Sequence, residues 1–118
     1  MTLSKVDRFR VVLAYLREHC PPLLSVGVRR CAMPRGTNAV ADCTLTLDRK
    51  GRPNIFTIRI SKGLPSTSAV DALIHEWAHA LSFTMQHPSF QDHGPEWGLA
   101  MSRCYLVVEG ARPQRRAS

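Results

Sequence analysis

The stretch DALIHEWAHAL, residues 71–81, contains the pattern H-E-x-x-H. Its apolar residues recur at intervals of three and four, which predicts an amphipathic helix. A helix places His75 and His79 one turn apart on the same face, so both imidazoles can reach one metal ion. Glu76 lies at the flank of that face and can take a proton from a water molecule without being a ligand. The stretch therefore predicts a metal site carried by a helix.

The apolar side of this predicted helix supports that interpretation. Its members are Val70, Ile74, Trp77, Ala78, Leu81 and Met85. On a helical wheel at about 100° per residue they form one arc, and the two histidines fall on the opposite side. Such a helix can bury its arc while it presents both histidines to a cleft. Ordinary surface histidines are the alternative, because H-E-x-x-H also arises by chance.

Two histidines are too few for a catalytic zinc site, which takes three protein ligands and keeps a position for water. The downstream candidates are His87, Asp92, His93 and Glu96. We expect His93 to be the third ligand, because it directly precedes Gly94-Pro95, where the chain enters a helix. Glu96 is the rival, since zinc sites with two histidines and a glutamate exist, and it could instead orient a ligand. His87 lies close to the end of the predicted helix, so the chain would have to fold back sharply for it to reach the metal.

The remaining patterns predict an α+β fold. An amphipathic helix over residues 5–20 ends at Pro21-Pro22, and a final helix opens at Pro95 and ends at Gly110. Period-two alternation predicts three strands over residues 24–31, 40–48 and 54–61, with the last two forming a hairpin. We expect a small three-stranded antiparallel sheet whose apolar face packs against the helices.

Two local features complete this expectation. In the second strand, Cys43, Leu45 and Leu47 share one face by alternation. Ser66 or Ser68 is expected to cap the helix that carries His75.

Length and composition indicate one domain over residues 1–111, followed by a basic, disordered tail over residues 112–118. No apolar run has the length of a membrane span and no secretory signal is recognisable, so we expect a cytoplasmic protein. The cysteines are Cys20, Cys31, Cys43 and Cys104, without C-x-x-C spacing. We expect four reduced thiols, although spacing alone would permit a disulfide between Cys31 and Cys43.

The chain is basic, with a formal net charge of +7 from 16 basic and nine acidic residues, and 13 of the basic residues are arginines. The arginine guanidinium forms bidentate hydrogen bonds with phosphate, so the composition favours an anionic partner such as nucleic acid. Outside the tail the charges are dispersed, and we therefore expect non-specific DNA contact, with an inert basic surface as the alternative.

The two histidine motifs together resemble the SprT-like zinc metalloprotease domain, which includes the Spartan DNA–protein crosslink proteases. In that family a helix carries H-E-x-x-H, and a third histidine lies downstream in an H-G-x-x-aromatic motif, here His93-Gly94-Pro95-Glu96-Trp97. The likeness spans roughly residues 5 to 109 and is greatest to short stand-alone SprT-like proteins of bacteriophages and prophages. It implies a zincin-like fold and Zn2+ held by His75, His79 and His93, with Glu76 as the catalytic base.

The chain also departs from this family. Many members carry a C-terminal four-cysteine zinc ribbon, and Spartan proteins carry DNA-binding and partner-recruiting segments. Neither pattern occurs in this sequence. Crosslink repair is therefore a role that the resemblance implies and that these residues do not themselves indicate.

The sequence thus favours a zinc-dependent endopeptidase acting on protein substrates. The alternatives are a zinc-stabilised nucleic-acid-binding module without protease activity, and a metal-dependent hydrolase of another substrate. Glu76 separates the first two hypotheses, because a structural site of three histidines needs no neighbouring carboxylate. Tyr105 could hold an oxyanion, although a packing role is favoured. The sequence predicts no oligomeric state.

Overall fold

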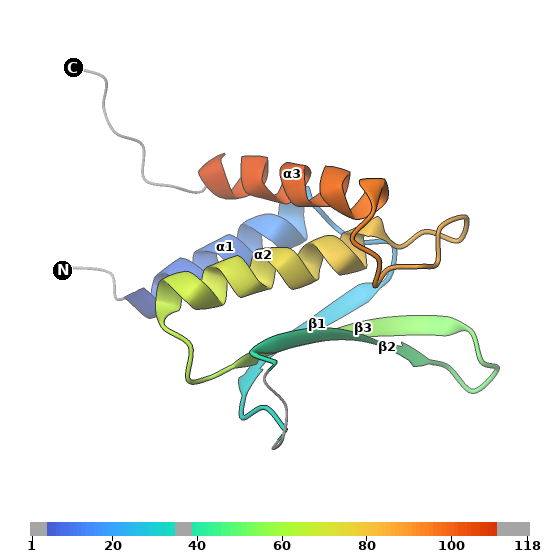
Figure 1. The fold of residues 1–118 in the computed structure, drawn as a ribbon, viewed down its shortest axis with the longest axis horizontal. Helices are drawn as coiled ribbons and strands as arrows, with labels where there is room; N and C mark the ends of the chain where they lie inside the picture. Colours follow the sequence, from blue (N-terminus) through green and yellow to red (C-terminus); the bar gives the residue numbers. More distant parts are fainter. Residues whose placement is uncertain (1–4, 35–38, 111–118) are drawn as a thin grey trace.

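Three helices lie on one side of a three-stranded sheet in the computed structural model, which describes residues 5–34 and 39–110 (Figure 1). The elements are α1 (Lys5–His19), β1 (Ser25–Cys31), β2 (Ala41–Leu47), β3 (Pro53–Ser61), α2 (Ser66–Ser82) and α3 (Pro95–Gly110). The predicted α+β architecture and the order of its elements are confirmed. The predicted tail over residues 112–118 falls outside the described residues.

The sheet is mixed, with the strand order β1-β3-β2. β2 and β3 form the predicted antiparallel hairpin, and the turn between them contains Gly51 with a positive φ of 77°. β1 pairs with β3 in the parallel direction, so the prediction of a purely antiparallel sheet is wrong. Successive strands run in opposite directions along the chain, as expected. Because β3 lies between β1 and β2, however, its neighbours are β2, which runs opposite to it, and β1, which runs in the same direction.

β3 is the central strand, and the face that it turns toward the helices is apolar. Phe56, Ile58 and Ile60 are fully buried and point toward the helices, where Val26 of β1 and Cys43 of β2 join them. Leu47 was predicted to share the face of Cys43, but it is 54% exposed. A register irregularity between Thr46 and Leu47 ends the alternation there.

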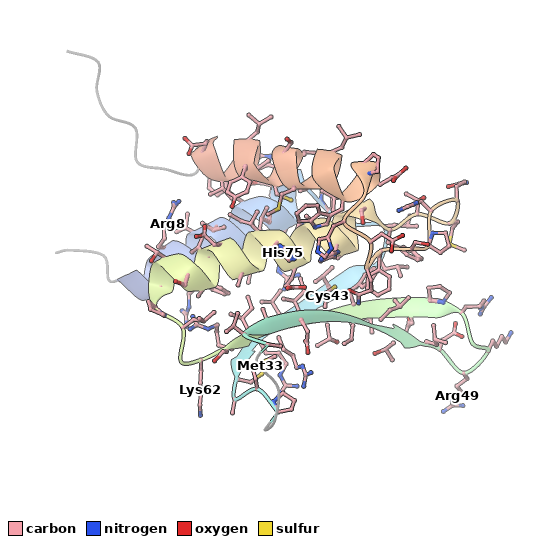
Figure 2. All side chains as sticks on the ribbon, viewed as in Figure 1. Arg8, Met33, Cys43, Arg49, Lys62 and His75 are labelled. Carbon is pink, nitrogen blue, oxygen red and sulfur yellow. The ribbon has the colours of Figure 1, made fainter. Side chains whose placement is uncertain are left out.

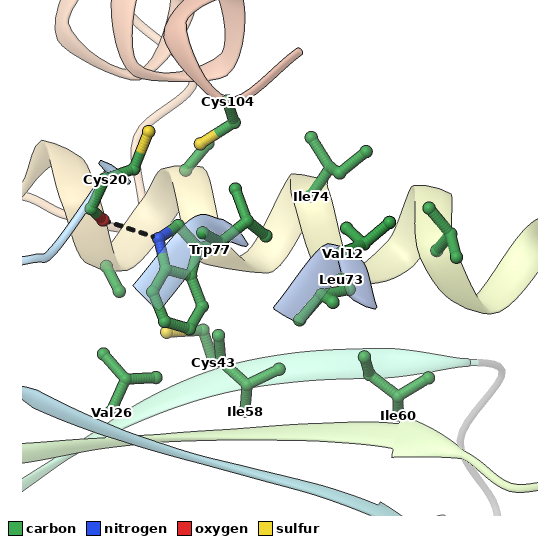
Figure 3. Close-up of a cluster of buried hydrophobic side chains, with 14 of the residues drawn as sticks. Val12, Cys20, Val26, Cys43, Ile58, Ile60, Leu73, Ile74, Trp77 and Cys104 are labelled. Atoms are coloured by element: carbon green, nitrogen blue, oxygen red, sulfur yellow. Dashed lines mark hydrogen bonds between the residues drawn. The ribbon is translucent and has the colours of Figure 1, made fainter. Parts of the chain in front are cut away.

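α2 is the central helix, since it packs against the sheet, α1 and α3. Trp77 lies in the core, and its indole N–H donates to the carbonyl of Cys20 at 2.9 Å (Figure 3). Most of the predicted apolar arc is buried, but Met85 lies beyond the end of the helix and is 66% exposed. The predicted serine cap is also wrong: Pro65 occupies the N-cap position, and no side chain caps the helix there.

All four cysteines are free thiols, as predicted. Cys31 and Cys43, whose spacing would permit a disulfide, are therefore not bonded to each other. Within the described part of the chain, every helix is too short or too polar to cross a membrane.

Candidate metal centre

Three histidines converge where the second half of α2 lies near the start of α3. His75 and His79 come from successive turns of α2, and His93 comes from the loop just before α3. The Nε2 atom of His75 lies 3.2 Å from that of His79 and 3.3 Å from that of His93. A ligand atom of each residue lies within 4.8 Å of the others, so the three could hold a metal ion.

The other candidate ligands lie differently. Glu96, at the first turn of α3, has its Oε1 atom 3.8 Å from Nε2 of His87. Asp92 is exposed. Among the described residues, the cluster with metal-binding geometry therefore contains His93 and neither of the two carboxylates.

The ring of His79 is oriented from its far side. Its Nδ1 atom lies 2.7 Å from the backbone carbonyl of Phe90. A carbonyl only accepts hydrogen bonds, so in neutral His79 the proton sits on Nδ1 and Nε2 presents its lone pair to the cluster. Partners of this kind fix the tautomer and the ring plane of metal-binding histidines.

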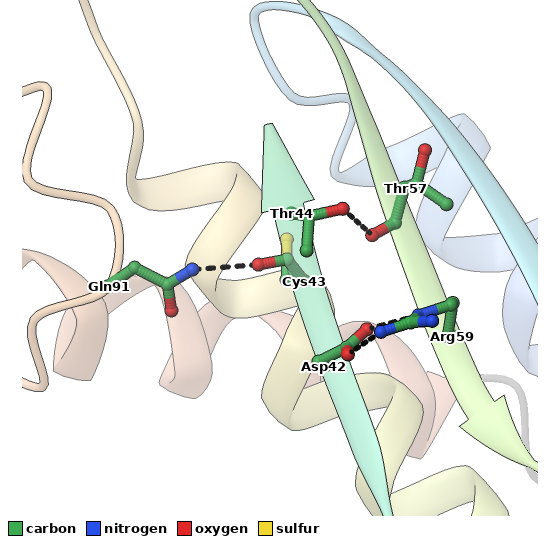
Figure 4. A network of polar contacts seen from close by, with 6 residues as sticks. All are labelled: Asp42, Cys43, Thr44, Thr57, Arg59 and Gln91. Carbon is green, nitrogen blue, oxygen red and sulfur yellow. Dashed lines mark hydrogen bonds and ion pairs between the residues drawn. The ribbon is translucent and has the colours of Figure 1, made fainter. Parts of the chain in front are cut away.

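The loop that supplies both the Phe90 carbonyl and His93 is anchored at two points. The Phe90 ring packs edge-on against Phe56 of β3, with ring centroids 5.0 Å apart, and also contacts Phe83. Beside it, Gln91 donates from its side-chain amide to the carbonyl of Cys43 on β2 at 2.8 Å (Figure 4). The position of His93 relative to α2 is therefore fixed by the sheet as well as by α3.

Trp97 covers the cluster from α3. Its ring centroid lies 5.1 Å from that of His75, 5.7 Å from that of His79 and 4.8 Å from that of His93. The indole N–H also donates to the backbone carbonyl of His75 at 3.4 Å. Trp97 thus ties the first turn of α3 to the middle of α2 and gives the histidines an apolar wall.

The surroundings of two of the histidines favour their neutral form. Burial lowers the pKa of His75, and the charge that His93 would carry when protonated adds to this effect. Burial also lowers the pKa of His79, where the hydrogen bond to Phe90 acts in the opposite direction. Neutral imidazole is the form that binds metal ions, so this electrostatic environment favours a metal site.

Glu76 directly follows His75 on α2 and is half-buried. It is close enough to Cys43 and Asp42 of β2 to interact electrostatically with both. Figure 2 shows Cys43 below His75, on the sheet side of α2. Burial raises the pKa of Glu76 to about 7, and the negative charge of Asp42 on β2 contributes. Asp42 itself is paired with Arg59 of β3. A carboxyl group with a pKa near neutrality is suited to accept and return a proton.

The sequence did not reveal two supporting residues, Phe90 and Gln91. Phe90 acts through its backbone carbonyl, which any residue could supply, so no residue pattern identifies it. Gln91 becomes visible only when β2 is placed beside the loop. Tyr105 lies two turns after Trp97 on α3, and its pKa is raised by burial and by the charge of Asp71 on α2.

The comparisons with known proteins agree with this geometry. No curated protein and no solved structure matches the chain. The family model described as SprT-like family matches residues 20–117, a range that includes the sheet, α2, the histidine-bearing loop and α3. From this match over most of its length, the chain belongs to the SprT-like family.

Proposed function

We propose that this chain is a zinc-dependent metallopeptidase that hydrolyses protein substrates. The SprT-like family is associated with zincin-like metallopeptidase domains, and three histidines here could hold a metal ion. The observation that carries the proposal is the convergence of three imidazole nitrogens beside a half-buried glutamate. A purely structural metal site would not need that glutamate.

Zinc fits the donor set. Three neutral imidazoles and an open fourth position are typical of catalytic zinc, with Zn–N distances of about 2.0–2.1 Å. At a tetrahedral angle, two such nitrogens are separated by about 3.3 Å. The separations from His75 Nε2 are 3.2 and 3.3 Å, so the two pairs that include His75 already have this spacing, and all three ligand atoms lie within 4.8 Å of one another.

The chain's own residues divide the work of peptide hydrolysis. Zinc, when bound, polarises the scissile carbonyl and makes a water molecule more acidic. We propose that His75, His79 and His93 are the ligands, with the Phe90 carbonyl holding the tautomer of His79. Glu76 takes the proton of the attacking water and returns it to the leaving amine, for which its raised pKa is suitable.

An edge of the sheet offers a place for the substrate backbone. The Ser61 N–H donates to the carbonyl of Val40, so the alternate residues Ala41, Cys43 and Leu45 point their backbone groups away from β3. Gln91 already donates to the outward carbonyl of Cys43, so a substrate would pair with the outward backbone groups on either side of that position. We infer that an extended substrate pairs along β2, because strand addition relies mainly on backbone hydrogen bonds.

A weak, non-specific contact with nucleic acid is proposed as a second property. Between residues 25 and 62 the described basic residues are Arg29, Arg30, Arg49, Lys50, Arg52, Arg59 and Lys62, against Asp42 and Asp48. Between residues 63 and 110 only Arg103 is basic, against five acidic residues. α1 adds Arg8, Arg10 and Arg17 against Glu18. Positive charge therefore gathers on the sheet segment and on α1, where phosphates would be attracted.

Casein digestion tests the proposed function. The purified protein should degrade casein when loaded with zinc, lose activity with a chelator, and regain it when zinc is restored. Intact casein at full zinc occupancy would contradict the peptidase proposal and would favour the zinc-stabilised binding module instead.

A further inference from the structure

A groove with a volume of about 470 Å³ runs along the flank of α3. Its wall includes Trp97, Gly98, Met101, Tyr105 and Leu106, and Glu109 lies at its far end. The volume is in the range of sites that bind ligands, which is roughly 300–1,000 Å³. Leu106 is 75% exposed, although burying an apolar side chain is favourable. The groove is thus an apolar surface that the described part of the chain leaves uncovered.

One end of this groove borders the metal centre through Trp97. Trp97 forms the wall of the groove, and its ring also lies 4.8 Å from the ring of His93 and 5.1 Å from that of His75, measured between centroids. Met101 follows one helical turn later, about 5.4 Å along the axis. An extended polypeptide rises about 3.3 Å per residue. A chain whose scissile bond is at the histidines can therefore reach Met101 within three residues.

We propose that this groove, the α3 groove, binds an apolar side chain of the substrate within three residues of the scissile bond. The inference rests on the proposed peptidase function and adds a substrate class to it: segments that carry a bulky aliphatic or aromatic residue beside the cleaved bond. Substrate pairing along β2 involves the backbone, so side-chain selection needs a separate surface such as this one. Continuity with the histidine cluster through Trp97 favours a substrate over an unrelated partner.

Gly98 provides a clean way to fill the groove. A Cβ atom added at this position would meet no other atom within 4 Å, so a larger side chain would extend into open space without disturbing the core. Leucine is also a better helix former than glycine, by roughly 0.8–1 kcal/mol for the interior of a helix. Gly98→Leu should therefore narrow the groove in a protein that still folds.

Two exposed leucines of α3 form a matched pair. Leu99 and Leu106 are each 75% exposed, but only Leu106 belongs to the groove wall. Leu106→Ser should weaken apolar recognition, whereas Leu99→Ser makes the same chemical change outside the groove and should behave like the unmodified protein.

The experiment uses the zinc-loaded protein and quenched fluorescent peptides of one sequence, with Leu or Ala placed in turn at each of the three positions on either side of the scissile bond. At one position, Leu should raise kcat/KM over Ala by roughly tenfold or more. Gly98→Leu and Leu106→Ser should lower that ratio toward one, and Leu99→Ser should leave it unchanged. Equal kcat/KM for Leu and Ala at every position, or a ratio that neither groove variant changes, would overturn the inference.

Binding provides a readout that does not depend on turnover. Fluorescence anisotropy with zinc-loaded Glu76→Gln protein should give a lower Kd for the Leu peptide than for the Ala peptide, and Gly98→Leu should remove the difference. Leucine-dependent binding without hydrolysis of any peptide would contradict the peptidase function but support apolar recognition by the α3 groove. Hydrolysis without a leucine preference would support the peptidase function but contradict recognition by the groove. A dimer that Leu106→Ser dissociates and Leu99→Ser does not would assign the groove to a second copy and overturn the proposal.

Discussion

At the scale of single residues, the candidate site depends on where each ring nitrogen points. The Phe90 carbonyl leaves Nε2 of His79 free to face the Nε2 atoms of His75 and His93. The H-E-x-x-H spacing predicts the first pair, because a helix fixes the distance between residues four apart. The place of His93 depends on how a loop returns to α2, which spacing alone does not determine.

The identity of the third ligand is a prediction at this scale. We expect His93→Ala to lose most of the bound zinc and Glu96→Ala to bind zinc with somewhat lower affinity. His87→Ala should bind as much zinc as the unmodified protein. The reason is that only His93 brings a nitrogen to the pair on α2, whereas Glu96 and His87 face each other. Zinc stoichiometry of the three purified variants measures this. Full occupancy in His93→Ala together with loss in Glu96→Ala would move the protein to a glutamate-liganded class.

Gln91 gives a second residue-scale prediction. Gln91→Ala removes the hydrogen bond that ties the histidine-bearing loop to Cys43, so His93 and the Phe90 carbonyl should become less well positioned. We expect zinc affinity to fall by roughly tenfold, the lower end of what changes behind metal ligands cost. Competition with a chelator of known affinity measures the change. Gln86→Ala, an exposed position in the same loop, is the control, and equal affinities of the two variants would contradict this role.

At the scale of elements, α2 has to satisfy two demands at once. It fills the core between the sheet and the other helices, and it also presents His75, Glu76 and His79 to the site. His79 is only 3% exposed, so one of the proposed ligands is held within the packed interior. Rigid packing of this kind keeps site residues in a fixed geometry.

Trp77 tests how firmly this helix is held. Trp77→Phe keeps an aromatic ring but removes the N–H that donates to the buried carbonyl of Cys20. Leaving a buried acceptor without its donor costs roughly 1–3 kcal/mol, which should lower the Tm by several degrees. Thermal unfolding followed by circular dichroism measures the change, with Leu99→Ala on the exposed side of α3 as the control. A Tm equal to that of the unmodified protein would show that this hydrogen bond adds nothing to stability.

The elements also show what local patterns can and cannot predict. Alternation located the strands, and the turn around Gly51 gave the hairpin direction. Val26 and Val28 of β1 alternate with the same period as Phe56 and Ile58 of β3, so no local pattern says which strand is central. Burial under the helices decides it, and the parallel pairing of β1 with β3 follows.

At the scale of the whole molecule, the charges are unevenly distributed along the chain. The sheet segment carries most of the described basic side chains and α1 adds Arg8, Arg10 and Arg17, while the segment from α2 to α3 is acidic apart from Arg103. The net charge of +7 alone did not reveal this division, because it depends on which segments fold together. An anionic polymer would thus be attracted to the sheet and α1, leaving α3 and its groove to a polypeptide.

Salt dependence tests this division. DNA should bind non-specifically, with a Kd of roughly 10⁻⁴–10⁻⁶ M at physiological salt, and the affinity should fall steeply as salt rises. Replacing Arg49 and Lys50, at the exposed hairpin turn, by glutamate should lower both the affinity and the salt slope, as should deleting residues 112–118. Titrations at several salt concentrations measure both quantities. Binding that is independent of salt, or absent at low salt, would exclude nucleic acid as a partner.

The central claim is that Glu76 acts as the base of a zinc peptidase whose ligands are three histidines. The most direct measurement is casein hydrolysis by Glu76→Gln, with zinc content determined on the same sample. Glutamine has the same shape but cannot accept the proton of the attacking water, so the rate should fall by about 10²–10⁴-fold or more while zinc stays bound. Activity equal to that of the unmodified protein, at full zinc occupancy, would contradict the account.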